Sequence, residues 1–192
     1  MENMAEAFRQ FERRLAAWAH DRADVRAVLI LGSRARTDRS ADQWSDLDIS
    51  LVVTDPQPYI DTTGWLDELG RVVLTFTELS AGGSPERRAL FEGMVDVDFV
   101  PLSTEVVQAR LDGSVSAESS ATLARGVRVL VDKDGLAARI THMKWKAPVV
   151  RPPTEDEYLN VVNDFWYHVV WTAKKIGRGE LWTALLKNSG EA

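Results

Sequence analysis

One strand pattern, at residues 46–53, constrains the fold more than any other part of the chain. Apolar residues at positions 47, 49, 51 and 53 alternate with Asp46, Asp48 and Ser50. This period of two predicts a strand whose apolar face is buried and whose other face carries carboxylates. Residues i and i+2 share a face, so the pattern brings the side chains of Asp46 and Asp48 towards one point.

A tight turn is expected shortly before this strand. The short β-rich apolar run 25–31 leads directly into Gly32, Ser33 and Arg34, and Asp46 follows fourteen residues after Gly32. Glycine permits close approach of the backbone, Ser33 offers a hydroxyl and an amide, and Arg34 can fork onto phosphate oxygens. The sequence predicts a buried strand ending in a phosphate-contacting turn.

A second acidic strand is predicted at residues 94–100, with Asp96 and Asp98 on one face. Mg²⁺ prefers hard oxygen ligands, and paired metal ions stabilise the attacking and leaving oxygens of phosphoryl transfer. Each signal alone usually marks an ordinary turn or a solvated strand face. Together they favour a metal site with Asp46, Asp48 and either Asp96 or Asp98, between which the spacing does not choose.

Further elements alternate irregularly, which predicts an α+β fold with a mixed sheet flanked by helices. The expected elements are an amphipathic helix at 4–18, a short helix capped by Thr62 or Thr63 and running to 69, a strand at 71–77, a helix from Ser103 to 111, and a strand at 127–131.

A boundary is predicted at the proline-rich segment 148–153. Thr154 and Glu157 form a capping-box pattern that opens a helix running to about Gly177, and another helix begins near Glu180. We therefore expect a catalytic domain at 1–147 and the beginning of a helical domain at 148–192.

Composition excludes several classes of protein. The net charge of −6 disfavours binding to extended nucleic acid and favours a small cationic ligand or Mg²⁺. No apolar run reaches the roughly 20 residues of a membrane-spanning helix. The absence of cysteine excludes disulfides, so we expect a cytoplasmic protein.

The sequence resembles the aminoglycoside 6-adenylyltransferases, the streptomycin-modifying members of the nucleotidyltransferase superfamily. The matching pieces are LGSRARTDRSADQWSDLDISLVVTD, GWLDELG, VDVDFVPL, VRVLVDKDGL and RPPTEDEYLNVVNDFWYHVVWTAKKIGRGEL. They span nearly the whole chain in the family's order. The resemblance implies ATP- and Mg²⁺-dependent transfer of AMP to a hydroxyl of an aminoglycoside, with release of pyrophosphate.

The resemblance also implies roles for individual residues. Asp46 and Asp48 would be metal ligands, and the acidic position of the family's later strand matches Asp96, which ranks Asp96 above Asp98 as the third carboxylate.

On the nucleotide side, Gly32, Ser33 and Arg34 would contact the triphosphate, and Lys174 would reach the phosphates from the helical domain. Asp164 would bind the cationic acceptor or act as general base.

Members of the resembled family continue through several more helices, so we expect the helical domain to be incomplete here. Apolar helix surface would then be exposed, which predicts self-association. Two alternative functions remain open. One is a nucleotidyltransferase with a protein or RNA acceptor, and the other is a non-catalytic nucleotide-binding relative.

Overall fold

The computed structural model describes residues 4–36, 38, 41–42, 44–80, 82–113, 115, 117–145 and 151–186. Its contacts divide the chain into two compact units, Met1–Pro148 and Val149–Ala192, and each is described by itself.

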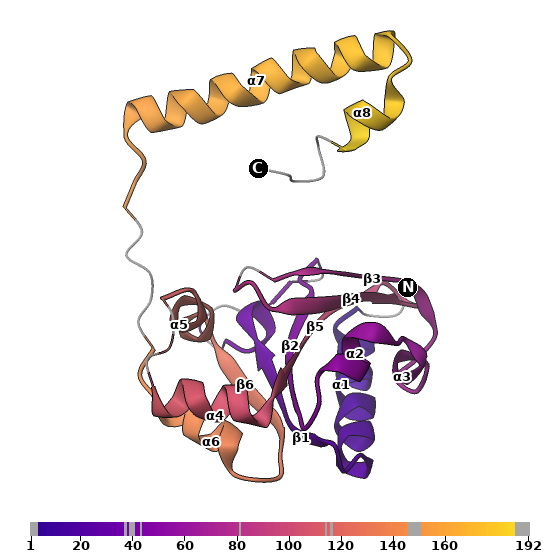
Figure 1. The fold of residues 1–192 in the computed structure, drawn as a ribbon, viewed down its shortest axis with the longest axis vertical. Coiled ribbons are helices and arrows are strands. Elements are labelled where there is room, and N and C mark those ends of the chain that lie inside the picture. The colour runs from indigo at the N-terminus through magenta and orange to yellow at the C-terminus, as the bar shows by residue number, and fades with distance from the viewer. Residues whose placement is uncertain are drawn as a thin grey trace. The chain divides into compact units, whose positions relative to one another are not determined.

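The first unit is built on one mixed sheet of six strands in the order β3-β4-β5-β2-β1-β6 (Figure 1). Only β2 and β5 pair in parallel among the described strands, and the other neighbours are antiparallel. The prediction of an α+β mixed sheet is confirmed. The strands are β1 Val25–Leu31, β2 Leu47–Val53, β3 Val72–Leu79, β4 Pro85–Phe91, β5 Val95–Ser103 and β6 Val127–Asp132.

One face of the sheet carries the larger hydrophobic core. Phe8, Phe11 and Leu15 recur at helical spacing and are buried against it, and the Phe11 and Phe91 rings lie 4.8 Å apart. Apolar residues of β2 and β5 point into the same core, as the period of two requires. The helices on this side are α1 Met4–Asp21, α2 Gln57–Asp61 and α3 Gly64–Asp67 (Figure 1).

Three other helices lie on the opposite face, beside β1 and β6. A smaller core of Leu29, Val52, Val107 and Ile140 holds two of them to the sheet. Asp48 of β2 and Asp98 of β5 also lie on this face, so it is apolar at one end and charged at the other. The helices are α4 Thr104–Asp112, α5 Ala117–Ala124 and α6 Leu136–His142.

Several sequence predictions need correction. Strand β4 was not expected, because Pro85 and the charged run 86–88 conceal its alternation; proline is tolerated at the first position of a strand. Thr63 occupies the N-cap position of α3, as one of the two alternatives predicted, but its side chain makes no capping hydrogen bond and the helix ends at Asp67 instead of residue 69. The hydroxyl of Thr62 donates to the carbonyl of Pro58 in α2. Helices α2, α5 and α6 were also missed.

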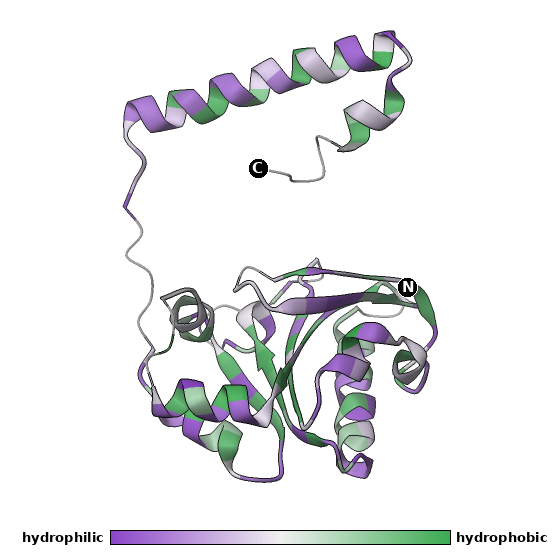
Figure 2. Ribbon diagram, viewed as in Figure 1, coloured by the Kyte–Doolittle hydropathy of each residue, from purple (hydrophilic) through white to green (hydrophobic). Residues whose placement is uncertain are grey.

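The second unit contains α7 Glu155–Gly177 and α8 Leu181–Leu186. The capping box is confirmed, because Glu157 N donates to Thr154 Oγ1 and Thr154 N donates to a carboxylate oxygen of Glu157. Apolar bands recur along α7 between polar ones (Figure 2). Across the described residues, no helix is both long enough and apolar enough to cross a membrane.

The core predicts a sharp contrast between two leucines. Leu51 on β2 is fully buried, whereas Leu79 on β3 is 70% exposed. Leu51→Ala should lower the free energy of unfolding by about 2–5 kcal/mol, because it leaves a cavity in the core. Leu79→Ala is the matched control and should change it by less than about 0.5 kcal/mol. Urea denaturation followed by near-ultraviolet circular dichroism measures both, and equal effects would contradict this core.

Candidate active site

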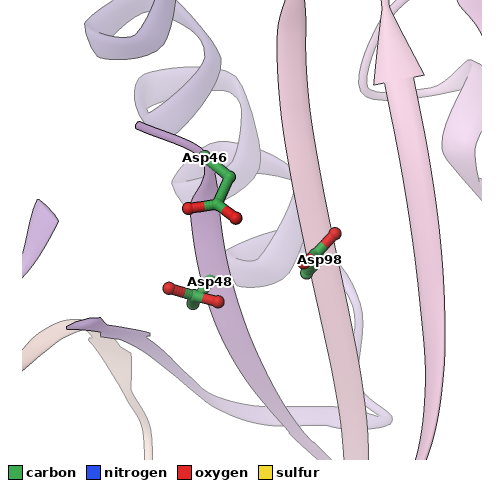
Figure 3. A group of neighbouring side chains, drawn as sticks. All are labelled: Asp46, Asp48 and Asp98. Carbon is green, nitrogen blue, oxygen red and sulfur yellow. The ribbon is translucent and has the colours of Figure 1, made fainter. Parts of the chain in front are cut away.

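The parallel pairing of β2 with β5 assembles a cluster of three carboxylates. The register places Asp48 beside Asp98, and Asp46 lies two residues earlier on the same face as Asp48. One carboxylate oxygen from each of the three lies within 4.8 Å of the others. Figure 3 shows Asp48 on β2, Asp46 just before the start of that strand and Asp98 on the neighbouring β5. Oxygen ligands at this spacing suit a divalent cation such as Mg²⁺.

Asp96 lies outside this group of three. It pairs with Leu90 of β4, one step beyond the end of the pairing between β2 and β5, which begins at Leu47 and Val97. Asp96 is exposed, whereas Asp98 is only 5% exposed. Partial loss of hydration, reinforced by the charge of Asp46, nevertheless raises the pKa of Asp96. The geometry thus favours Asp98 as the third carboxylate, against the ranking that the resemblance gave.

Gly32 is required by the position of Asp48. Leu31 pairs with Asp48 across β1 and β2, so the turn after β1 touches this carboxylate. A Cβ atom at Gly32 would lie 2.6 Å from Asp48 Oδ2, and the backbone φ of +65° is strained for other residues. Glycine therefore lets the turn and the carboxylate occupy adjacent space.

Ser33 presents an unused hydroxyl in this turn, the 3₁₀ element η1 Gly32–Arg34. Its Oγ atom is buried and makes no hydrogen bond within the described part of the chain. Buried polar groups normally have partners, so a hydroxyl of this kind is suited to a ligand oxygen.

Arg34 is held by the protein's own backbone. Its Nε donates to the carbonyl of Asp46 at 2.9 Å, and its Nη2 donates to the carbonyl of Ser45 at 2.6 Å. Its guanidinium carbon lies 3.4 Å from the centre of the Phe8 ring. Burial lowers its pKa. These contacts make Arg34 a positioning residue for Asp46, and its predicted phosphate contact stays a prediction.

Burial dominates the electrostatics of the cluster. It raises the pKa of Asp48 to about 6 and that of Asp98 to about 7, because a buried carboxylate loses hydration. Asp46 and Glu86 add repulsion at both positions, and the cation of Arg88 opposes it. A bound divalent cation would relieve this repulsion.

Glu86 and Arg88 are site residues that the sequence analysis missed. Arg88 Nη2 lies 3.1 Å from Asp98 Oδ2, while its Nε contacts carboxylate oxygens of Glu86 and Glu78 at 3.1 and 2.7 Å. Both residues lie on β4, and a strand that was not expected could give no signal for its side chains.

A cavity of about 260 Å³ extends from the carboxylates over β1 and β5 towards α4, α5 and α6. Its polar end contains Gly32, Asp48, Asp98 and Glu86, and most of its remaining wall is apolar. Arg110 and Arg125 also line it, so this side presents positive charge. A molecule combining an anionic group with an apolar ring fits such a lining.

Asp164 and Lys174 lie on α7, in the second unit. Asp164 is exposed and contacts His168 Nδ1 at 3.3 Å, one turn along the helix. Their proposed roles stay predictions.

Comparison with known proteins places the chain in a family. The family model for streptomycin adenylyltransferase matches residues 7–189. An aminoglycoside 6-adenylyltransferase of Staphylococcus aureus is 24% identical over 180 residues, covering 89% of this chain and 60% of that protein. One from Campylobacter jejuni is 27% identical over 172 residues, covering 84% and 54%.

Among solved structures, a Bacillus subtilis aminoglycoside 6-adenyltransferase matches with a TM-score of 0.44 and 19% identity, covering 96% of this chain and 61% of that one. The chain spans about 54–60% of the length of the curated relatives it matches. The family model spans nearly all of the first unit and most of the second, so the chain belongs to the streptomycin adenylyltransferase family.

Proposed function

We propose that this protein transfers AMP from ATP to a hydroxyl of a cationic aminoglycoside such as streptomycin, in a reaction that depends on Mg²⁺. The observation that carries the proposal is the carboxylate cluster of Asp46, Asp48 and Asp98, which lies against the Gly32 turn. The similarity to three aminoglycoside 6-adenylyltransferases supports the choice of acceptor.

Asp46, Asp48 and Asp98 would hold the metal. The fit rests on their hard oxygen donors, on their mutual spacing and on burial, which together with nearby carboxylates raises the pKa values of Asp48 and Asp98. Bound Mg²⁺ would neutralise charge on the triphosphate and on the attacking and leaving oxygens.

The remaining roles belong to the chain itself. The free hydroxyl of Ser33 would donate to a phosphate oxygen, and Arg34 would keep Asp46 in place. The acceptor oxygen would bond to the α-phosphorus as the bond to pyrophosphate breaks, and the hydroxyl proton would pass to a base. We propose Asp164 as that base. We propose Lys174 as a cation that contacts the phosphates.

The overall charge of the chain agrees with this acceptor. The net charge of −6 attracts a polycation by long-range electrostatics. We also propose that the protein self-associates, because apolar side chains of α7, among them Val161 and Phe165, are exposed.

The activity can be tested directly. Incubation with ATP, Mg²⁺ and streptomycin should give AMP-modified drug detectable by mass spectrometry. Asp48→Asn should reduce the rate about 100-fold or more, because it removes a metal ligand whose effect on the transition state is several kcal/mol.

A folded protein that binds Mg-ATP but never modifies streptomycin would contradict the acceptor assignment. Labelled ATP with protein and tRNA acceptors would then test the other acceptor classes. Thermal stabilisation by Mg-ATP with no modified acceptor at all would support a non-catalytic relative.

Asp98 and Asp96 form a matched pair for testing the metal site. Asp98→Asn should weaken Mn²⁺ binding at least about tenfold, because it removes a ligand of the cluster. Asp96→Asn removes the same charge two residues away and should change binding less than about threefold, since exposed charges are screened. Electron paramagnetic resonance of free Mn²⁺ measures both affinities. The opposite order would restore Asp96 as the third carboxylate.

A further inference from the structure

Trp44 is the most exposed large hydrophobic side chain of the described residues, with 84% of its surface accessible. Single exposed apolar residues are common and usually need no explanation. Trp44 differs because it lies two residues before Asp46, at the edge of the carboxylate cluster. Two residues of chain span at most about 7 Å, so the Cα atom of Trp44 lies within that distance of the Cα atom of Asp46. One sugar ring could therefore contact both the indole and the cluster.

The turn that carries Trp44 is anchored. Asp42 Oδ1 accepts hydrogen bonds from Trp44 N and from Ser45 Oγ, both at 2.9 Å. Ser45 Oγ also accepts from Asp42 N, and Arg34 fixes the Ser45 carbonyl from the protein side. The indole is therefore exposed on a held turn, and binding there would cost little ordering of the backbone.

Carboxylates lie on this turn and near it, while the cation of Arg34 contacts it from the protein side. Hydrogen bonds from Ser45 and Trp44 lower the pKa of Asp42, so its carboxylate is ionised at neutral pH. Asp46 and the exposed Asp96 lie on the neighbouring strand ends. An aromatic face with carboxylates beside it attracts cations and repels polyphosphates.

The Ser33 turn and the cavity suit a nucleotide better than the turn that carries Trp44 does. The free Ser33 hydroxyl and the cavity lined by Arg110 and Arg125 offer donors and positive charge, which suit phosphates and disfavour a polycation. The two substrates would thereby be separated by the charge of the groups that they meet.

We propose that Trp44 is the platform on which the cationic sugar acceptor lies, with its indole against a ring or a cationic group of that acceptor. The inference rests on the proposed function. It adds an acceptor contact from the first unit, next to the residues that would hold the metal.

Kinetics test the contact. Trp44→Ala should raise KM for streptomycin about tenfold, the usual scale of a lost cation–π contact in a partly desolvated site, and leave KM for Mg-ATP unchanged. Trp44→Phe should retain most of the affinity. Val73→Ala, an exposed apolar residue of β3, is the control and should change neither constant. An unchanged KM for streptomycin, or equal changes for both substrates, would overturn the inference.

A binding measurement separates this inference from the proposed function, because it needs no turnover. Acrylamide quenching of the wild type and of Trp44→Phe isolates the Trp44 signal from those of the other six tryptophans. With Mg²⁺ and a non-hydrolysable ATP analogue present, streptomycin should protect that signal. Spermidine, a polycation without a ring, should protect it less.

Each combination of results is informative. Protection without transfer to any acceptor would support the platform and contradict the proposed activity. Transfer without protection would contradict the platform alone. Protection that follows protein concentration rather than streptomycin, with a doubled mass in analytical ultracentrifugation, would assign Trp44 to contact between copies and overturn the inference.

Discussion

The parallel register of β2 and β5 is the constraint on which the rest of the site depends. It places Asp48 beside Asp98, and Asp46, two residues earlier in the chain, completes the group of three. Burial removes hydration from these carboxylates and their neighbours repel them, so the pKa values of Asp48 and Asp98 are raised. The arrangement persists because the opposite faces of the same two strands are buried in the main core, where Leu51 and other apolar side chains hold the strands together.

Two local contacts refine what the register provides. Gly32 leaves room for the Asp48 carboxylate at a distance where any Cβ would collide with it. Arg34 donates hydrogen bonds to the backbone carbonyls of Ser45 and Asp46, which fixes the backbone of Asp46 just before β2 begins. The same arginine fixes the turn that exposes Trp44. Metal ligation and the inferred acceptor contact thus share one support, and a disturbance of Arg34 would reach both.

Much of this could be predicted from the sequence, where periodicity was clean. The alternation in residues 46–53 identified β2 and its carboxylates, and the capping box at Thr154 identified the start of α7. Strand β4 was missed because its charged run 86–88 hides the alternation, and Glu86 and Arg88 were lost with it. The choice between Asp96 and Asp98 needed strand register, which no period of two encodes, since both residues share a face. Trp44 was passed over for a similar reason, because a short polar loop gives no periodic signal of exposure.

If Asp46, Asp48 and Asp98 form one divalent-metal site, crystals containing Mn²⁺ and a non-hydrolysable ATP analogue should reveal it by anomalous X-ray diffraction. We expect an anomalous peak bounded by oxygens of all three side chains, at about 2.0–2.3 Å from each ligand, with the triphosphate running towards Ser33. A peak held by Asp96 in place of Asp98, or an ordered nucleotide with no metal at these carboxylates, would contradict it.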